Sequence, residues 1–111
     1  MTTIDVDGLA GQMLAAALPM LSKSAMDARA FAEVEFTKIA LTIRSIGEQV
    51  ASGQLTEQQA TLLLDMQTHA SKNVLLTLEG LALLGAEAAM NAALGAVKTA
   101  VNTAVGFALI A

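Results

Sequence analysis

The stretch FTKIALTIRSIGEQV, residues 36–50, spaces its apolar side chains at intervals of three and four residues. A helix brings such positions to one side, whereas a strand would alternate them between two faces. The charged residues of the stretch mostly fall off this stripe, so the pattern predicts a buried helix face. The residues of the stripe are Phe36, Ile39, Ile43, Ile46 and Val50.

Residues that favour helix ends surround this stripe and set the predicted bounds of the helix at 24–52. Ser24 and Asp27 have the spacing of a capping box, and Gly53 suits the left-handed residue that follows a last helical turn. Before it, we predict a short helix over residues 5–18. Asp5 or Asp7 caps its start, and Pro19 ends it, because the residue before a proline avoids helical dihedral angles.

A second long helix is predicted from residue 56 onward. In LTEQQA, Thr56 is followed three residues later by Gln59, which is a capping box. The connection after Gly53 is short, so we expect this helix to fold back antiparallel against 24–52. Leu63, Met66, Ala70 and Val74 are predicted to face the stripe, and a solvated side is predicted for Gln58, Asp65, His69, Lys72 and Glu79.

The end of this second helix is open. Either one helix runs over residues 56–111, or it bends or breaks near 80–85, where Gly80 and Gly85 weaken it, and the last third folds back. A partner helix of residues 24–52 is too short to cover a continuous helix of this length, so the extended form requires other subunits.

The composition favours an all-α fold in one domain, residues 1–111. Hydrophobic residues make up 55% of the chain and charged residues 14%, against about a quarter charged in typical soluble domains. The apolar residues are mostly strong helix formers, and the chain has one proline. The fold expected is a helical hairpin with a short N-terminal helix and a long Ala/Gly-rich C-terminal helix, assembled as a homo-oligomeric helix bundle.

The charges argue against several partners. The net charge is −4 and the Lys and Arg residues are scattered, so the sequence lacks the basic surface that binds nucleic acid. There is no cysteine, which excludes disulfides and thiolate metal sites. The first residues do not form a signal peptide, so a cytoplasmic location is expected.

Residues 91–111, NAALGAVKTAVNTAVGFALIA, contain a repeat with an 11-residue period. Asn91 and Asn102 repeat at this interval, as do Gly95 and Gly106. Eleven residues make three helical turns, so equivalent positions return to nearly the same side of a helix. Small residues at a spacing of four let two helices approach closely, and a buried Asn fixes their register. The predicted self-association residues are Gly85, Ala88, Asn91, Ala92, Gly95, Ala96, Ala100, Asn102, Ala104, Gly106 and Ala108.

Three interpretations of this segment are compatible with the sequence. It is the edge of an ordinary buried helix, a surface through which copies of the chain associate, or a helix that contacts or inserts into a membrane. We favour self-association. The longest charge-free run of the C-terminal segment, residues 99–111, is shorter than the ~20 residues that a spanning helix needs, and Glu87 is costly in hydrocarbon.

No motif in the sequence predicts chemistry. His69 is the sole histidine, and Asp65 lies one helical turn before it, but the position three residues before His69 is Met66 rather than the Glu that a dinuclear carboxylate site requires. There is no G-x-S-x-G and no phosphate-binding glycine loop. We therefore predict no catalytic, cofactor-binding or metal site, and a non-enzymatic structural or interaction module whose partner is a second copy of itself. The alternative is a membrane-associated protein whose C-terminal helices insert or line a pore.

Overall fold

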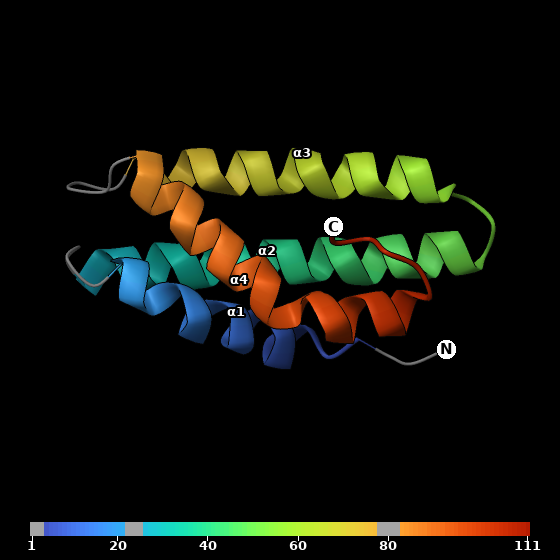
Figure 1. The fold of residues 1–111 in the computed structure, drawn as a ribbon, viewed down its shortest axis with the longest axis horizontal. Coiled ribbons are helices and arrows are strands. Elements are labelled where there is room, and N and C mark those ends of the chain that lie inside the picture. The colour runs from blue at the N-terminus through green and yellow to red at the C-terminus, as the bar shows by residue number, and fades with distance from the viewer. Residues whose placement is uncertain (1–3, 22–25, 78–82) are drawn as a thin grey trace.

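Four α-helices make up most of the residues that the computed structural model describes, namely 4–21, 26–77 and 83–111, without the side chains of 26–28. No strand occurs in these ranges, which confirms the predicted all-α fold. Figure 1 shows the helices in chain order. They are α1 (Val6–Leu21), α2 (Met26–Ala51), α3 (Glu57–Leu75) and α4 (Leu83–Val105).

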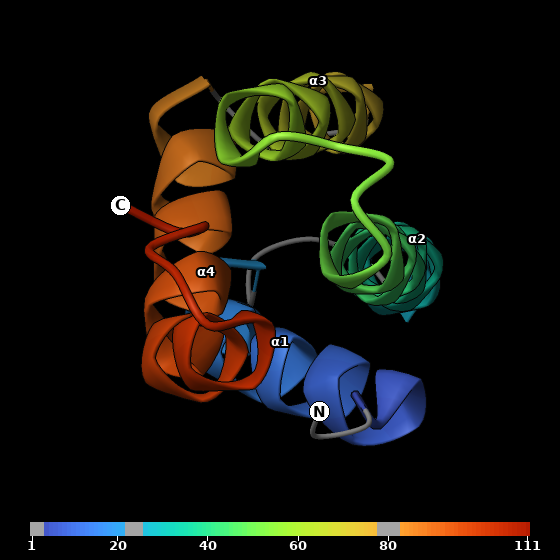
Figure 2. The same ribbon diagram turned by 90° about the vertical axis from the view of Figure 1, so that its right-hand side faces the viewer.

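The four helices pack around one elongated core, and the molecule measures 43 × 22 × 19 Å. α2 and α3 lie side by side along the long axis, and α1 contacts both α2 and α4 extensively (Figures 1 and 2). α4 crosses the long axis obliquely. It starts beside the end of α3 and finishes beside α1 and α2 (Figure 1).

The apolar stripe of α2 forms the centre of the core, as predicted. Phe36, Ile39 and Ile43 are completely buried, Ile46 is nearly so, and Val50 packs against them while partly exposed. Burying a side chain of this size stabilises the fold by roughly 1.5–3 kcal/mol relative to exposure, so this stripe contributes a large share of the folding energy.

The turn between α2 and α3 has the predicted chemistry. Gly53 adopts a left-handed φ of +80°, a conformation that glycine reaches without steric cost. The Thr56 hydroxyl accepts from the Gln59 N–H at 3.1 Å, and the Gln59 side chain accepts from the Thr56 N–H at 3.0 Å. The capping box is therefore complete. The predicted cap formed by Ser24 and Asp27 lies outside the described residues.

The predicted end of the first helix is wrong. Asp5 caps its start, accepting from the Gly8 N–H at 3.2 Å, but the helix continues through Pro19 to Leu21. Ala17 is fully buried and Leu21 is 3% exposed. Burial of the last turn in the core therefore outweighs the local preference of the residue before proline.

The predicted inner face of the third helix is also wrong. Leu63 and Met66 are 39% and 60% exposed, and Ala70 is exposed as well. The buried side chains of α3 are Ala60, Leu64, Ser71 and Leu75. The helix is thus rotated by about one residue, or roughly 100°, from the predicted orientation. Lys72, predicted on the solvated side, is partly buried; Glu79 lies outside the described residues.

The chain does not continue as a single helix from 56 to 111. α3 ends at Leu75, Leu76 and Thr77 form a turn, and α4 begins at Leu83, so Gly85 lies within α4. The helix also ends before residue 111. Gly106 has a φ of +86° and stops it in the manner of a left-handed helix cap. Gly106 and the five residues after it, the tail (106–111), fold back over the molecule.

Candidate interaction site on α4 and the tail

α4 buries one face against the rest of the molecule. This inner face packs chiefly on α1 and consists mostly of alanine and valine, which allow a close helix–helix approach. Near its end, Val105 approaches α2 so closely that a Cβ on Gly47 would lie 3.2 Å from Val105 Cγ1. The buried residues are Ala86, Ala89, Met90, Ala93, Val97 and Val101.

None of the predicted self-association residues lies in the core. Exposed positions are Asn91, Gly95, Ala96, Ala100, Gly106 and Ala108, and partly exposed positions are Gly85, Ala88, Ala92, Asn102 and Ala104. They do not form one face, however. Positions four residues apart are rotated by about 40° around the helix axis, so a series with this spacing moves from one side of the helix to another. Ala104 has turned toward the inner face, and Gly106 and Ala108 belong to the tail.

A narrower set of these residues shares the side of α4 that is turned away from the core. We call it the outer face of α4, defined as Ala92, Gly95, Ala96, Thr99, Ala100 and Thr103. All of its members except Ala92 are exposed, and none is charged. The two charged side chains of α4, Glu87 and Lys98, instead line cavities beside α3. The outer face is therefore small, uncharged and open.

The two asparagines of the repeat have different surroundings. Asn91 is exposed at the edge of the gap between α3 and α4. Asn102 pairs with the tail of its own chain: its Nδ2 donates to the Ile110 carbonyl oxygen and its Oδ1 accepts from the Ile110 N–H, both at 2.9 Å. The sequence pattern predicted that Asn102 fixes the register between two helices, and it did not predict the pairing with Ile110 of the same chain. A glycine at position 106, which can adopt a left-handed φ, was the sequence feature that could have indicated a turn there.

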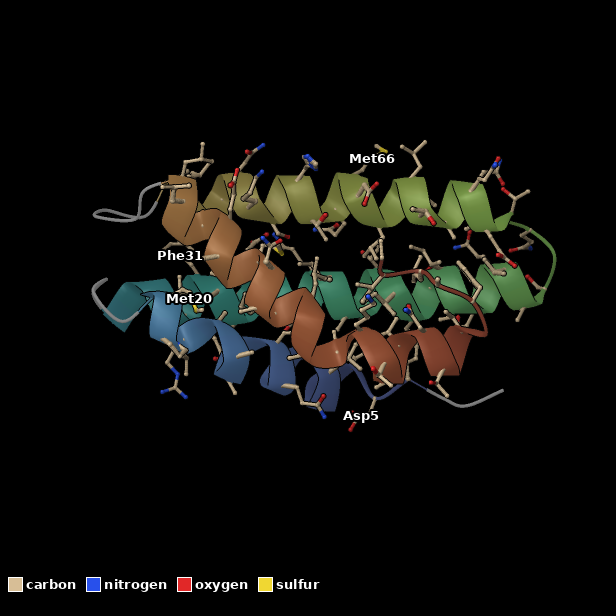
Figure 3. The ribbon with its side chains drawn as sticks, in the orientation of Figure 1. Asp5, Met20, Phe31 and Met66 are labelled. Carbon is tan, nitrogen blue, oxygen red and sulfur yellow. The ribbon has the colours of Figure 1, made fainter. Side chains whose placement is uncertain are left out.

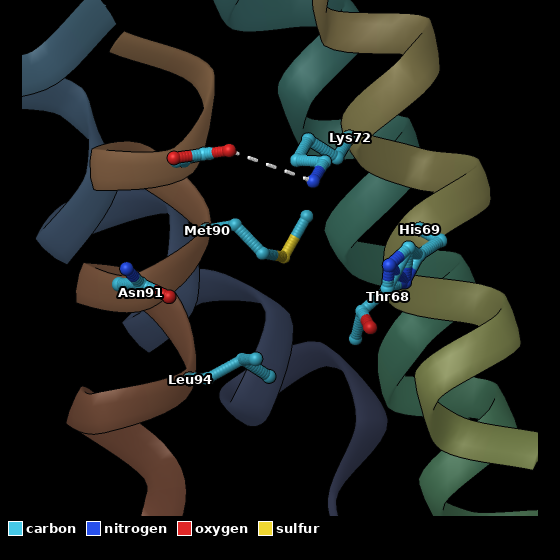
Figure 4. Close-up of a pocket in the computed structure, with 7 residues that line it drawn as sticks. Thr68, His69, Lys72, Met90, Asn91 and Leu94 are labelled. Carbon is cyan, nitrogen blue, oxygen red and sulfur yellow. Dashed lines mark ion pairs between the residues drawn. The ribbon is translucent and has the colours of Figure 1, made fainter. Parts of the chain in front are cut away.

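A groove separates α3 from α4 and contains two adjoining cavities of about 230 and 510 Å³, which share Thr68, Asn91 and Leu94. Figure 4 shows side chains from both helices around the smaller cavity, with Met90 between them. At this end Lys72 Nζ lies 3.9 Å from Glu87 Oε1, a partly exposed ion pair. Such a pair adds little stability but favours this approach of the helices.

The His69 ring Nδ1 lies 3.1 Å from the backbone oxygen of Asp65, so the exposed imidazole contacts the backbone of its own helix. Across the ranges that the structure describes, no three residues among His, Cys, Asp and Glu are grouped so as to hold a metal ion.

The sequence pattern did not predict that α3 has an exposed apolar surface. Leu62, Leu63 and Met66 are 39–60% exposed, and Figure 3 shows Met66 pointing away from the other helices. Leu63 and Met66 border a shallow cavity of about 420 Å³ between α2 and α3, whose lining includes Ile46. Of these residues, Leu63 and Met66 were predicted to face the stripe of α2, because their spacing is as helical as that of the true inner face.

None of the helices in the described ranges combines the length and the hydropathy required to cross a bilayer. A comparison with protein-family models, with curated proteins and with solved structures finds no match to this chain.

Proposed function

We propose that the protein is a non-enzymatic interaction module that associates with further copies of itself through the outer face of α4. In this proposal, the antiparallel hairpin of α2 and α3, together with α1, forms a scaffold that holds α4 at the surface, and two or more chains assemble into a larger helix bundle.

The observation that carries the proposal is the separation of charge on α4. Glu87 and Lys98 line the groove beside α3, while the outer face carries neither a charge nor a side chain larger than threonine. Helices with small residues at their contact approach to about 8 Å, where backbone and side-chain atoms of both helices make many van der Waals contacts. A charged outer face would prevent this approach, because the charges would have to be desolvated.

The mass in solution tests the proposal. Light scattering after size-exclusion chromatography, over a range of concentrations, should give a mass above the 11.4 kDa of one chain. Ala96→Glu places a charge in the middle of the outer face and should reduce the mass to that of one chain. Ala15→Glu is the matched control, because Ala15 is also exposed on a helix, α1. A wild-type chain that stays monomeric at every concentration would contradict the proposal.

Membrane association of α4 is a second candidate, favoured by Leu83 and Leu84 at the start of the helix, which are 52% and 79% exposed. Flotation with vesicles of neutral and of anionic lipids distinguishes the two functions. Self-association leaves the protein at the bottom of the gradient with both lipids. Membrane association lifts it to the vesicle layer, and replacement of both leucines by serine returns it to the bottom.

A further inference from the structure

The gap between α3 and α4 is wedge-shaped, and the tail fills its wide end. The helices are close where Lys72 meets Glu87, and α4 then slopes away from α3 toward α1 (Figure 1). The tail turns back from the end of α4 into this space, as Figures 1 and 2 show. It reaches α3: Phe107 and Ala108 border a cavity together with Glu57, Gln58 and Thr61.

The surface that holds the tail has the chemistry of a peptide-binding site. We call this surface the seat; it includes Asn102 of α4 and the start of α3 at Glu57, Gln58 and Thr61. The carboxamide of Asn102 binds the backbone of Ile110 through two hydrogen bonds, which recognise a peptide unit whatever its side chain. Leu109 and Ile110 supply affinity, since they are 2% and 6% exposed and belong to the core. The tail thus lies between the end of α4, which it directly follows in the sequence, and α3, which is distant in the sequence.

We propose that this seat also accepts the tail of a second copy, so that associated chains exchange residues 107–111. The inference rests on the proposed self-association, which brings two copies of α4 together. Because an exchanged tail makes the same contacts as the tail of its own chain, the exchange loses none of the bonding described above. The exchange adds only the conformational change at the residue where the tail leaves α4 and the free-energy cost of association.

The geometry of α4 places the two seats within reach. Asn102 lies between Ala100 and Thr103 of the outer face in the sequence and is itself partly exposed. Helices packed through small residues lie about 8–10 Å apart, and the five residues 107–111 span up to roughly 17 Å when extended. When the two copies of α4 pack parallel through this face, a tail released from its own seat can therefore extend to the Asn102 of the neighbour.

Gly106 is the hinge that decides between the two arrangements. Its φ of +86° closes the tail on its own chain, and a Cβ there would meet no atom within 4 Å. Gly106→Ala therefore strains the closed turn without a steric clash and favours an extended hinge. The left-handed conformation becomes about tenfold less favourable with a side chain, so we expect the exchanged fraction to rise by up to that factor. Gly53→Ala is the matched control, with φ +80° and equally open surroundings.

Crosslinking between single-cysteine variants detects the exchange directly, because the chain has no cysteine of its own. Gln58 and Ala108 are both exposed and border the same cavity. One chain carries Gln58→Cys, the other carries Ala108→Cys and an affinity tag, and a short thiol-reactive crosslinker is added to their mixture. The doubly substituted chain, linked within itself, shows that the two positions are close enough. Ala108→Cys mixed with Ala15→Cys controls for random collisions.

We expect a crosslinked dimer between the Gln58→Cys chain and the Ala108→Cys chain. The yield of this mixed dimer should increase with Gly106→Ala but not with Gly53→Ala. Links within the doubly substituted chain alone would overturn the inference. A mass above one chain without mixed links would leave the proposed function standing and refute the exchange. Mixed links that persist when Ala96→Glu is added would instead show that the outer face is not needed for association.

Discussion

Asn102 and Ile110 form a reciprocal pair in which one side-chain amide satisfies both backbone groups of the other residue, at 2.9 Å in each direction. Ile110 is nearly buried, and a buried backbone N–H or carbonyl without a partner is costly. The pair therefore explains how a segment without regular secondary structure enters the core. It also gives the tail a defined register on α4.

Asn102→Leu should destabilise the protein through this pair. The substitution leaves the Ile110 N–H and carbonyl without their partner, so we expect the free energy of unfolding to fall by about 1–3 kcal/mol. Urea denaturation followed by circular dichroism measures it. Asn91→Leu is the control, since Asn91 is exposed and should change stability by less than about 0.5 kcal/mol. Equal losses in both variants would show that the pair contributes nothing.

Phe36→Ala should be among the most damaging single substitutions. Phe36 is completely buried in the stripe of α2, and Phe31 on the same helix is 51% exposed. Removing a buried phenyl ring loses its transfer free energy and leaves a cavity, so unfolding should become easier by about 3–5 kcal/mol. Phe31→Ala removes the same atoms from a partly exposed site and should cost much less. Thermal denaturation of the two variants compares them, and similar melting temperatures would contradict the assignment of the core.

The third helix shows how far periodicity predicts a buried face. Two stripes run along α3, one through Leu63, Met66 and Ala70 and one through Leu64, Ser71 and Leu75, and the second contains a serine. The first stripe is the more apolar, and it is the one that the sequence pattern predicted to face α2. In the structure, Gln67 Nε2 donates to the buried Ser71 Oγ at 3.0 Å, which removes the penalty for burying this hydroxyl. This contact joins residues four apart within α3, and a pattern that scores only apolar residues does not include it.

The interactions that decide the ends of helices were predictable when they were local and not when they were tertiary. The capping box of Thr56 and the left-handed Gly53 lie within a few residues of one another, and both were predicted correctly. The continuation of α1 beyond Pro19 depends on Leu21 reaching the core. The return of the tail depends on the pairing of Ile110 with Asn102, eight residues before it. This pairing was not predicted because the 11-residue repeat was interpreted as a continuous helix.

Thr56→Ala tests the local prediction. The variant loses the hydroxyl that accepts from the Gln59 N–H, so the stability should fall by about 1 kcal/mol, a typical value for a helix N-cap. Gln58→Ala, in the same turn and exposed, controls for loss of a surface side chain and should be close to neutral. The midpoint of urea denaturation distinguishes them. A neutral Thr56→Ala would mean that water replaces the hydroxyl without cost.

The glycines of α1 and α2 should respond in opposite directions to added side chains. A Cβ at Gly47 would lie 3.2 Å from Val105 Cγ1 and 3.9 Å from Ile4 Cδ1, whereas one at Gly11 would meet nothing within 4 Å. Gly47→Leu therefore forces α2 away from the end of α4, and we expect a loss of about 1–3 kcal/mol in the free energy of unfolding. Gly11→Ala changes only the helix propensity of this position, so we expect the free energy of unfolding to rise by up to about 1 kcal/mol. Both are measured by thermal denaturation. A stabilising Gly47→Leu would show that α2 and the end of α4 do not pack as closely as the structure shows.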